Sequence, residues 1–406
     1  MKTPYLKRSL EPVLERAAKD FPVVVLTGPR QSGKTTLLNH LFGKTHRHVS
    51  LELPDVRAAA LADPRGFLAI HPPPVIFDEI QYCPDLLMYV KEAVDAHRSR
   101  RGQYLLTGSQ NMLLLERVTE SLAGRAAILR LLPLSFREAF GTPDALLPWE
   151  NPRRKRTAHL SIESLWHRLL RGNYPELVVE PERGFRLWHG SYMQTYIERD
   201  VRLVRQIGDL AIFQNFLRSL AARSGQLINL SDISRDLGAA VNTLKIWLSV
   251  LEASHQVVVV RPYFANVGKR LVKTPKVYFT DTGTLCYLSG LKDASHAAAG
   301  PLAGAIFETA VLTEIIKTFV HRGDEPEVYF WRTSTGSEVD FIIHVEGRLI
   351  PIEVKLSATL QPSMAGSILA FQKDIGAKAD SGFVIHPGDT RLPLSPRVMG
   401  IPFSEW

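Results

Sequence analysis

Residues 23–38 constrain the fold of this 406-residue chain more than any other segment. Their sequence, VVVLTGPRQSGKTTLL, runs from a β-branched apolar stretch through a glycine-containing loop into residues that favour a helix. Positions 28–35 match the spacing G-x-x-x-x-G-K-[ST], in which backbone N–H groups at the start of a helix surround phosphate groups. The order of strand, loop and helix therefore predicts an α/β domain with a phosphate-binding loop, or P-loop.

The residues of this loop are expected to bind ATP. The ammonium group of Lys34 is expected to reach the β and γ phosphates, and the hydroxyl of Thr35 is expected to hold Mg²⁺. The predicted ATP-binding residues are Gly28, Pro29, Arg30, Gln31, Ser32, Gly33, Lys34, Thr35, Thr36, Asp78 and Ser109.

Two further apolar strands are expected to end beside the P-loop. The strand at residues 75–77 is followed by Asp78, a predicted Mg²⁺ ligand, and by Glu79, which is expected to polarise the attacking water. The strand at residues 104–106 is followed by Thr107, Gly108 and Ser109. The hydroxyl groups there are expected to respond to the γ-phosphate.

The chain resembles the AAA+ ATPases of bacteria and archaea that carry a C-terminal domain of unknown function, DUF4143. The similarity extends over almost the whole sequence and implies an AAA+ core with a parallel sheet. The segments that carry it are GPRQSGKTT, VIFDEIQ, LLTGS, SLAGR, RGNYPEL, TYIERDV, KTPKVYFTDTG, FE and EVDF.

In such families an arginine often completes the ATP site of a neighbouring subunit. Arg125, at the end of SLAGR, is the first candidate for this role, and Arg30 is the second. The alternative for both residues is a structural ion pair. A role in a neighbouring subunit requires a homo-oligomer, which is expected to be a ring and possibly a hexamer.

The positive charge of the chain is concentrated in its middle third. Residues 1–150 contain 19 Lys and Arg against 16 Asp and Glu, residues 151–300 contain 21 against 12, and residues 301–406 contain 9 against 13. Phosphate contacts dominate the affinity of proteins for nucleic acid, so the middle segment is expected to bind DNA. The alternative is a basic surface that only faces solvent.

The pattern of residues 213–260 resembles a winged helix with a short strand at 227–230. Ser231 is expected to cap a helix at residues 232–237, and a recognition helix is expected at 242–253. Winged helices also join domains or bind proteins, and that alternative stays open. The residues predicted to contact DNA are Asn242, Thr243 and Lys245 of the helix, with Lys269, Arg270, Lys273 and Lys276 of a basic hairpin.

The C-terminal segment contains a predicted β-hairpin with the sequence SEVDFIIHV-EG-RLIPIEVKL. A two-residue turn at positions 346–347 places Val345 opposite Arg348. Counting outward from the turn places Asp340 opposite Glu353 on one face of the sheet. Opposed carboxylates repel each other unless a cation lies between them, and Mg²⁺ is the expected cation.

A helix expected at residues 303–319 adds Glu308 on its apolar face, where an unpaired charge is costly. A helix Glu, a strand Asp and E-x-K resemble the PD-(D/E)xK nuclease superfamily, although valine replaces the proline of its name. The resemblance implies that Asp340 and Glu353 bind Mg²⁺, that Glu308 supports it, and that Lys355 positions or deprotonates the attacking water. The alternative is a structural hairpin with a surface ion pair.

These observations predict an α/β fold: a P-loop AAA+ core, a winged helix and a small α/β restriction-endonuclease-like domain. The expected function is ATP-dependent DNA binding and processing. The alternative is a nucleotide-switched regulator or scaffold whose nuclease-like fold is catalytically silent; a defence or toxin module would share the same sites. The expected domains are residues 1–145 (AAA+ core), 146–206 (helical linker or lid), 207–282 (winged helix with basic hairpin) and 283–406 (nuclease-like domain).

The cysteine spacing and the length of the apolar runs indicate the cellular compartment. Its two cysteines, Cys83 and Cys286, have neither disulfide-framework nor metal-site spacing, and no apolar run is long enough to cross a bilayer. A reducing cytoplasm, with no membrane partner, is therefore expected.

Overall fold

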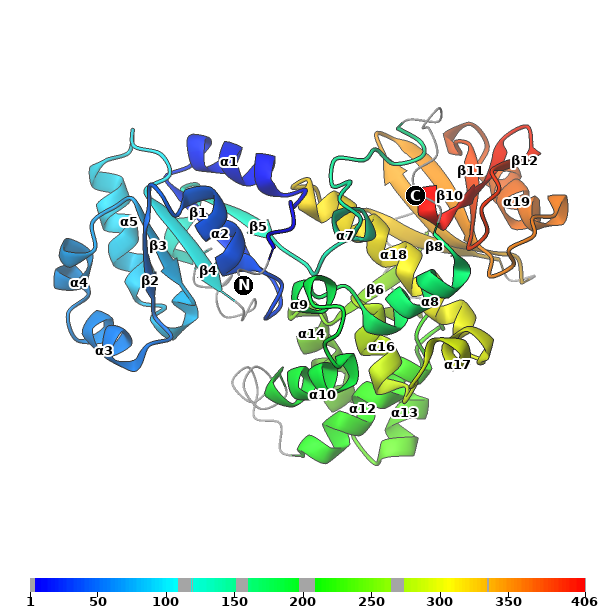
Figure 1. Cartoon of the computed structure of the whole chain (residues 1–406), viewed down its shortest axis with the longest axis horizontal. Coiled ribbons are helices and arrows are strands. Elements are labelled where there is room, and N and C mark those ends of the chain that lie inside the picture. Colours follow the sequence, from blue (N-terminus) through cyan, green and yellow to red (C-terminus); the bar gives the residue numbers. More distant parts are fainter. Residues whose placement is uncertain are drawn as a thin grey trace.

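The computed structural model describes residues 4–108, 118, 120–150, 160–196, 209–263, 274–333 and 336–405. Figure 1 shows an N-terminal α/β part on the left and a larger part, formed by the middle and C-terminal segments, on the right. The helices α7 (Phe136–Ala139) and α18 (Ala303–His321) lie where the two parts meet.

The N-terminal part is built around a parallel sheet with the strand order β2-β3-β4-β1-β5. This arrangement confirms the predicted parallel-sheet core. The strands are β1 (Val23–Thr27), β2 (Arg47–Ser50), β3 (Val75–Asp78), β4 (Tyr104–Gly108) and β5 (Ala126–Arg130).

Helices cover both faces of this sheet. Val24 and Leu26 of β1 share a core with α1 and α2, whereas Val23 and Val25 share a core with α3, α4 and α5. A strand that is buried on both faces needs apolar residues at every position, which explains the uninterrupted run at its start. The helices are α1 (Glu11–Asp20), α2 (Lys34–Phe42), α3 (Pro54–Ala62), α4 (Pro64–Ile70), η1 (Ile80–Tyr82) and α5 (Leu86–Ala96).

Because all five strands are parallel, their carboxyl ends meet at one edge of the sheet. The strand β4 lies between β1 and β3. The loop after β1, Asp78 at the end of β3, and Thr107 in β4 are therefore brought together at this edge. Ligands of open parallel sheets bind at such an edge, where neighbouring connections diverge.

The described part of the middle segment is helical as far as residue 253 and then forms an antiparallel hairpin. Among the described residues, no helix is both long and apolar enough to cross a lipid bilayer. The elements are α8 (Ile162–Arg171), α9 (Pro175–Val179), α10 (Phe185–Tyr196), α12 (Leu210–Ala222), α13 (Leu230–Leu237), α14 (Val241–Ala253), β6 (Val257–Pro262), β7 (Lys276–Phe279), α16 (Thr282–Leu288) and α17 (Ala294–Ala299).

The helices α12 to α14 and the hairpin β6–β7 occur in the order expected of a winged helix, but two local predictions are wrong. The helix α13 begins at Leu230, and its cap is Asn229, whose side chain accepts a hydrogen bond of 3.0 Å from the N–H group of Ser231. Residues 227–230 form no strand, because only Leu227 makes a bridge to Lys276. Asparagine is as favourable as serine at the position that caps a helix, so Asn229 can cap this helix two residues before Ser231.

The C-terminal hairpin has the predicted register. Val345 of β9 lies opposite Arg348 of β10, and the ladder continues to the pair Phe341 and Ile352. The turn residues Glu346 and Gly347 have φ angles of 50° and 77°, as a primed turn requires. The elements are β8 (Val328–Arg332), β9 (Glu338–Val345), β10 (Arg348–Val354), η3 (Pro362–Ala365), α19 (Gly366–Ile375), η4 (Gly376–Lys378), β11 (Gly382–His386), β12 (Leu392–Ser395), β13 (Val398–Pro402) and η5 (Phe403–Glu405).

The middle and C-terminal segments share one sheet and one hydrophobic core. The strand order is β12-β13-β11-β10-β9-β8-β6-β7, so the strand β6 of the expected winged helix pairs directly with β8. The core extends from Leu132 to Phe403 and includes residues from the expected linker. Strands on both sides of the expected boundary at residues 282 and 283 therefore belong to one sheet.

Candidate functional site

The loop between β1 and α2 has the backbone conformation of a phosphate-binding loop. Gly28 has a φ angle of 142°, and a Cβ atom there would lie 2.1 Å from the carbonyl oxygen of Leu131. Gly33 has a φ angle of 96°. Both positions require glycine, because a side chain would clash with the chain after β5 or strain the backbone.

The start of α2 places donors and a cation inside this loop. No side chain caps the helix, so its first N–H groups remain directed at the loop, as anion binding at a helix N-terminus requires. Lys34 is buried, and its ammonium group donates hydrogen bonds of 3.0 Å and 2.9 Å to the carbonyl groups of Gly28 and Pro29. The Lys34 charge therefore lies at the centre of the loop.

Asp78 connects the neighbouring strands to α2. Its carboxylate accepts hydrogen bonds from the hydroxyl groups of Thr35, at 2.9 Å and 3.1 Å, and of Thr107. His48 of β2 lies 3.7 Å from the same carboxylate. Burial acts to raise the pKa of Asp78, but the bonds from His48, Thr107 and Thr35 outweigh it and lower that pKa.

The chain changes direction at Glu79, directly after β3 ends at Asp78. The Glu79 φ angle of 58° is in the left-handed region, which is uncommon for a residue with a side chain. Its N–H group donates a hydrogen bond of 3.0 Å to the hydroxyl of Thr107, and its carboxylate accepts one from Gln81. Backbone strain of this kind concentrates at functional sites.

The donors Thr35 and Asp78 fit a magnesium ion. Both supply hard oxygen atoms, they already lie within 2.9 Å of each other, and the lowered pKa keeps Asp78 ionised. A bound Mg²⁺ would neutralise charge on the phosphates, and Thr35 and Asp78 would hold it.

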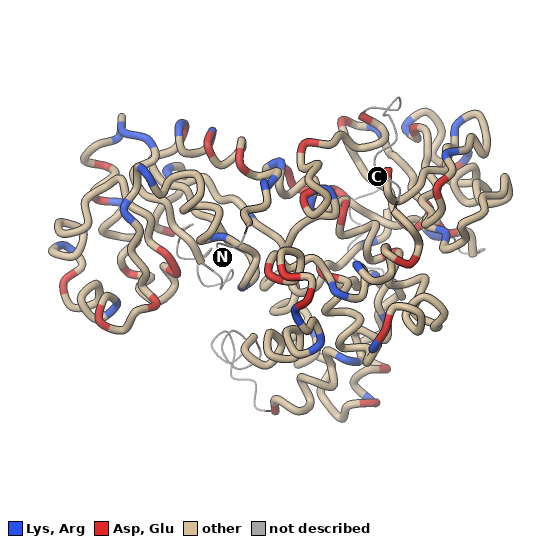
Figure 2. The backbone as a smooth tube through the Cα atoms, in the orientation of Figure 1, with Lys and Arg blue, Asp and Glu red and all other residues tan. Residues whose placement is uncertain are grey.

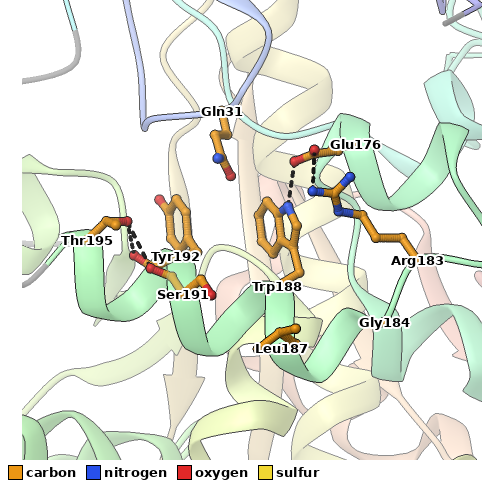
Figure 3. A pocket seen from close by; sticks show the side chains of 9 residues that line it. All are labelled: Gln31, Glu176, Arg183, Gly184, Leu187, Trp188, Ser191, Tyr192 and Thr195. Atoms are coloured by element: carbon orange, nitrogen blue, oxygen red, sulfur yellow. Dashed lines mark hydrogen bonds and ion pairs between the residues drawn. The ribbon is translucent and has the colours of Figure 1, made fainter.

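Two pockets adjoin the P-loop, and sequence reasoning did not identify their walls in α9 and α10. One pocket, of about 400 Å³, is lined by Tyr5, Thr36 and Leu37 of the N-terminal part and by Pro175 of α9. The other, of about 450 Å³, lies below the side chain of Gln31 (Figure 3). The motif RGNYPEL, which includes Pro175 and Glu176, was the available signal.

The second pocket is lined by residues of α10 and by the ion-paired Glu176 and Arg183. Trp188 and Tyr192 stack with ring centroids 5.3 Å apart, and Trp188 donates a hydrogen bond of 2.6 Å to Glu176. Glu176 also pairs with Arg183 at 2.9 Å (Figure 3). The P-loop therefore faces the middle segment across a polar and aromatic surface.

Arg8 is a buried residue that supports the P-loop and that sequence reasoning missed. Its guanidinium group donates hydrogen bonds to the carbonyl groups of Ser32, at 2.9 Å, and Leu132, at 2.7 Å. It also pairs with Glu138 at 3.1 Å. Burial alone would raise the pKa of Glu138, but the Arg8 guanidinium holds that pKa below its ordinary value.

The helix α18 of the C-terminal segment contacts the same buried residues, Leu132 and Glu138. His321, its last residue, accepts a hydrogen bond of 3.1 Å at Nε2 from the N–H group of Leu132, and its Nδ1 lies 3.2 Å from Glu138. Nearer the middle of α18, Glu314 accepts a hydrogen bond of 2.6 Å from the N–H group of Phe136. The C-terminal segment is thus attached to the chain that supports the P-loop.

Arg125 lies at the edge of the sheet opposite its own P-loop, because it directly precedes β5 and β5 is parallel to β1. Its guanidinium group makes two contacts with Asp95, at 2.8 Å and 2.9 Å. Arg125 therefore lies away from the P-loop of its own chain and makes the structural ion pair that was the alternative to a role in ATP hydrolysis. Arg30 lies within the P-loop itself, and Ser109 lies outside the described residues.

The predicted DNA-binding residues differ in their exposure. Asn242 and Lys245 are exposed on α14, and Thr243 is half-buried. Lys276 needs correction: it is 4% exposed in β7 and its ammonium group lies 2.5 Å from Glu338 and 3.4 Å from Glu308, so it cannot contact a phosphate backbone. Lys269, Arg270 and Lys273 lie outside the described residues.

The described part of the middle segment is close to electrically neutral. Figure 2 shows its Lys and Arg residues interspersed with Asp and Glu. Most of the positive excess lies in residues 151–159, 197–208 and 264–273, which are outside the described part. The electrostatic expectation for DNA binding therefore depends on these three stretches.

The predicted carboxylates of the C-terminal segment gather around two lysines. Asp340 accepts a hydrogen bond of 2.8 Å from the N–H group of Val354, and Glu353 accepts one of 2.6 Å from Lys355. Glu308 accepts a hydrogen bond of 2.5 Å from Tyr278 and lies 3.4 Å from Lys276. The expected helix and hairpin therefore bring these groups into one region.

The carboxylates in this region repel one another. Burial and the charge of Asp340 raise the pKa of Glu308 to about 7 and that of Glu353 to about 8. Burial also raises the pKa of Asp340. However, among the residues that the structure describes, no three His, Cys, Asp or Glu side chains converge so that they could hold a metal ion. The ammonium group of Lys276 supplies positive charge there instead.

Family models match three successive parts of the chain. An AAA domain model matches residues 20–140, a domain of unknown function, DUF8612, matches residues 162–295, and DUF4143 matches residues 303–406. The DUF4143 match begins after the expected winged-helix segment, which lies within the DUF8612 match.

Several known proteins are similar along most of their length. The uncharacterized proteins Rv2008c of Mycobacterium tuberculosis and Mb2031c of Mycobacterium bovis are each 30% identical over 394 residues, which cover 97% of this chain and 82% of theirs. Among solved structures, the Walker-type ATPase PABY2304 of Pyrococcus abyssi aligns with a TM-score of 0.45 and 17% identity, over 69% of this chain and 94% of that chain.

Proposed function

Because the chain belongs to the family of AAA-domain ATPases that carry a DUF4143 domain, we propose that it hydrolyses ATP and couples hydrolysis to the binding and processing of DNA. One observation carries the ATPase part of this proposal. The hydroxyl of Thr35, at the start of α2, is joined to Asp78, at the end of β3, beside the buried ammonium group of Lys34. This arrangement brings a cation, a hydroxyl and a carboxylate to one phosphate-binding loop.

Each residue of the site has a separate role in hydrolysis. Lys34 and the first N–H groups of α2 bind the phosphates and stabilise the negative charge that develops on them. Glu79, turned away from β3 by its left-handed backbone, orients and polarises the water that attacks the γ-phosphate. Thr107 fixes the position of both acids, because its hydroxyl bonds to Asp78 and to the N–H group of Glu79.

The DNA part of the proposal is supported by the winged-helix arrangement. The helix α14 presents Asn242 and Lys245 to solvent, beside a hairpin whose connection contains Lys269 and Arg270. Contacts of this kind position a duplex through its phosphates, and exposed polar residues of the helix can read base edges.

The processing activity is assigned to the C-terminal carboxylates. Asp340, Glu353 and Lys355 come from one hairpin with the predicted register, and Glu308 comes from α18. Lys276 pairs with Glu308 and Glu338, so participation of Glu308 in binding a divalent ion would require this lysine to move. The nuclease part therefore includes a rearrangement of this lysine.

The protein is also proposed to form a homo-oligomer. Arg125 lies away from the P-loop of its own chain, so any contribution to hydrolysis would be made in a neighbouring copy. Assembly into a ring would place it there, at the expense of its pairing with Asp95.

A panel of DNA-binding and cleavage assays tests the function as a whole. Duplex, single-stranded and branched DNA are incubated with Mg²⁺ or Mn²⁺, with and without ATP, using the wild type, Lys34→Ala and Asp340→Ala. We expect ATP-dependent binding that is lost in Lys34→Ala and cleavage that is lost in Asp340→Ala. Intact DNA in every lane would contradict the proposed DNA-processing activity.

The second candidate is a nucleotide-switched regulator whose C-terminal site is catalytically silent. The position of Lys276 favours it, since its ammonium group already pairs with Glu308, one of the proposed metal ligands, and with the neighbouring Glu338. The salt dependence of binding separates the candidates, because DNA binding through phosphates weakens steeply as salt increases. Lys245→Ala should lower both the affinity for DNA and the slope with salt. Absence of DNA binding at low salt would favour the regulator.

A further inference from the structure

A pocket of about 580 Å³ lies between α10, α12 and the end of α16, and it shares no lining residue with the two pockets beside the P-loop. The three helices are neighbours in the middle segment (Figure 1). Arg186 of α10 and Arg218 of α12 both line the pocket, so each of these helices contributes one guanidinium group. Among the described residues of the lining, none is an aspartate or a glutamate. The pocket is therefore positively charged.

Arg186 and Arg218 have no counter-ion in the described part of the chain. Arg223, directly after α12, pairs with Asp236 at 2.9 Å. Arg186 and Arg218 are exposed and make neither an ion pair nor a hydrogen bond with any described residue. Guanidinium groups that are free of a carboxylate and line one pocket can bind the oxygen atoms of an anion.

Neutral hydrogen-bond donors line the same pocket. Gln214 lies one helical turn before Arg218 on α12, and its amide makes no hydrogen bond with a described residue. The hydroxyl of Tyr287 on α16 likewise makes none, and a Cβ atom at Gly190 would lie 3.0 Å from it, so glycine allows α10 to approach closely. Guanidinium, amide and phenol groups all donate hydrogen bonds, whereas phosphate oxygens accept them. The lining therefore fits phosphate groups.

The end of α16 opposes this preference only weakly. A helix C-terminus carries about half of a negative charge, whereas the two guanidinium groups carry two full positive charges. The carbonyl groups of Leu285, Cys286 and Tyr287 at this end already accept hydrogen bonds from backbone N–H groups of the chain that follows. The net charge of the pocket thus favours an anion.

The pocket lies on a different face of α12 from the predicted recognition helix α14. Phe213 and Phe216 of α12 contact Trp247 of α14, with ring centroids 5.2 Å and 5.7 Å apart. Because a helix has about 3.6 residues per turn, Gln214 and Arg218 lie on another side of α12 from these phenylalanines. A ligand of the pocket would therefore not occupy the surface of α14.

We propose that this pocket binds phosphate groups of a DNA backbone and forms a contact surface separate from α14. The proposal rests on the DNA binding proposed above and adds a site within the described part of the middle segment. Contacts with phosphates position DNA without reading its sequence. The pocket thus contributes affinity for any duplex, and its contribution depends on salt.

Fluorescence anisotropy with the full chain and labelled duplex DNA tests the proposal over a range of salt concentrations, with Mg²⁺ and a non-hydrolysable ATP analogue. Each phosphate contact contributes about 0.9 to the slope of log K against log salt. Arg186→Gln/Arg218→Gln should therefore lower the slope by about 1.8 and weaken binding about 10- to 100-fold at about 0.1 M salt. Arg186→Lys/Arg218→Lys keeps both charges and should retain most of the slope. Each single glutamine variant should lower the slope by about 0.9.

Arg223→Gln/Arg235→Gln is the matched control. It removes the same charge from two arginines that pair with Asp236 and Asp232 and that do not line the pocket. It should keep the slope of the wild type. Thermal unfolding checks that every variant is folded, and the single variants provide the test if the double variant is unstable.

Three outcomes separate this site from the function on which it rests. If the folded glutamine variants keep the affinity and slope of the wild type, the proposed phosphate site is wrong while DNA binding by the wild type stands. An equal loss in Arg223→Gln/Arg235→Gln would also contradict the site, because the effect would then follow from net charge alone. If the wild type binds no DNA at low salt, the DNA part of the proposed function is wrong as well.

Discussion

The hydroxyl of Thr35, the second residue of α2, donates a hydrogen bond of 2.9 Å to the carboxylate of Asp78, the last residue of β3. The two residues are 43 positions apart in the sequence. The parallel sheet brings them together because β3 and β1 flank the same strand. This contact defines the position at which phosphate and divalent cation are expected to meet, and the first prediction follows from it.

Asp78→Asn should abolish the dependence of nucleotide binding on Mg²⁺. The substitution keeps the shape of the side chain and removes the negative charge that a divalent ion requires. We expect hydrolysis to fall by at least about a hundredfold, since charge stabilisation of this size is typical of one electrostatic contact. Titration of Mg²⁺ at fixed ATP measures the effect. Unchanged Mg²⁺ dependence in a folded variant would contradict the assignment.

Glu79→Gln should separate binding from hydrolysis. The amide cannot polarise water as the carboxylate does, whereas the P-loop contacts to the phosphates stay intact. The rate of hydrolysis is expected to fall by about 10²- to 10⁴-fold, with the affinity for ATP within about twofold of the wild type. Single-turnover hydrolysis and equilibrium binding together measure both quantities. A parallel loss of affinity would show that Glu79 acts in binding instead.

Glu138→Gln should destabilise the junction between the two parts of the molecule. The change leaves Arg8 buried without its carboxylate partner, which costs about 3–5 kcal/mol of unfolding free energy at neutral pH. Because the pKa of Glu138 is lower in the folded chain than in the unfolded chain, its stabilising effect is complete above about pH 4.3 and is lost below it. Urea denaturation at pH 7, 5.5 and 3.5 measures the difference between wild type and variant.

The difference should be constant between pH 7 and pH 5.5 and smaller by about 1 kcal/mol at pH 3.5. A difference that grows as the pH falls would contradict the ionised state of Glu138. Glu325→Gln is a suitable control, because Glu325 pairs with Arg130 near the same junction but is largely exposed.

Glu353→Gln should show the opposite dependence on pH. Folding raises the pKa of Glu353 to about 8, so ionisation of this group opposes folding as the pH rises from about 4.3 towards 8. The variant should therefore gain stability relative to the wild type over this range. Thermal unfolding at several pH values measures it, and a constant difference would contradict the repulsion between Glu353 and Asp340.

Addition of Mn²⁺ at pH 8 extends the same measurement to the question of a metal. An ion that binds only the folded state stabilises it, so the melting temperature rises with the logarithm of the ion concentration once that concentration exceeds the dissociation constant. The nuclease proposal expects a rise in the wild type that is absent in Glu353→Gln. No rise in either protein would favour the catalytically silent alternative, in which Lys276 holds the carboxylates.

Features with local signals could be predicted from the sequence. The P-loop was identifiable because its glycines and its lysine must occur at fixed spacing between a strand and a helix. The register of the C-terminal hairpin followed from a two-residue turn with glycine in its second position, and the structure confirms it from Arg348 to Ile352. In both cases neighbouring residues determine the geometry.

Features that depend on distant residues could not be predicted. Arg8, Glu138 and His321 form one buried group although 313 positions separate the first from the last. Lys276 follows a basic stretch and resembles a phosphate contact, but the pairing of β6 with β8 carries its strand into the core. Neither the spacing nor the charge of these residues in the sequence indicates the tertiary contacts that decide their roles.

The measurement that tests the account most directly is the binding and hydrolysis of ATP by the purified chain and by Lys34→Ala, both shown by circular dichroism to be folded. We predict that the wild type binds ATP with Mg²⁺ and releases phosphate. Lys34→Ala should release none above background, because the substitution removes the ammonium group at the centre of the loop. Failure of the folded wild type to bind ATP at millimolar concentration, or equal hydrolysis by Lys34→Ala, would contradict the account.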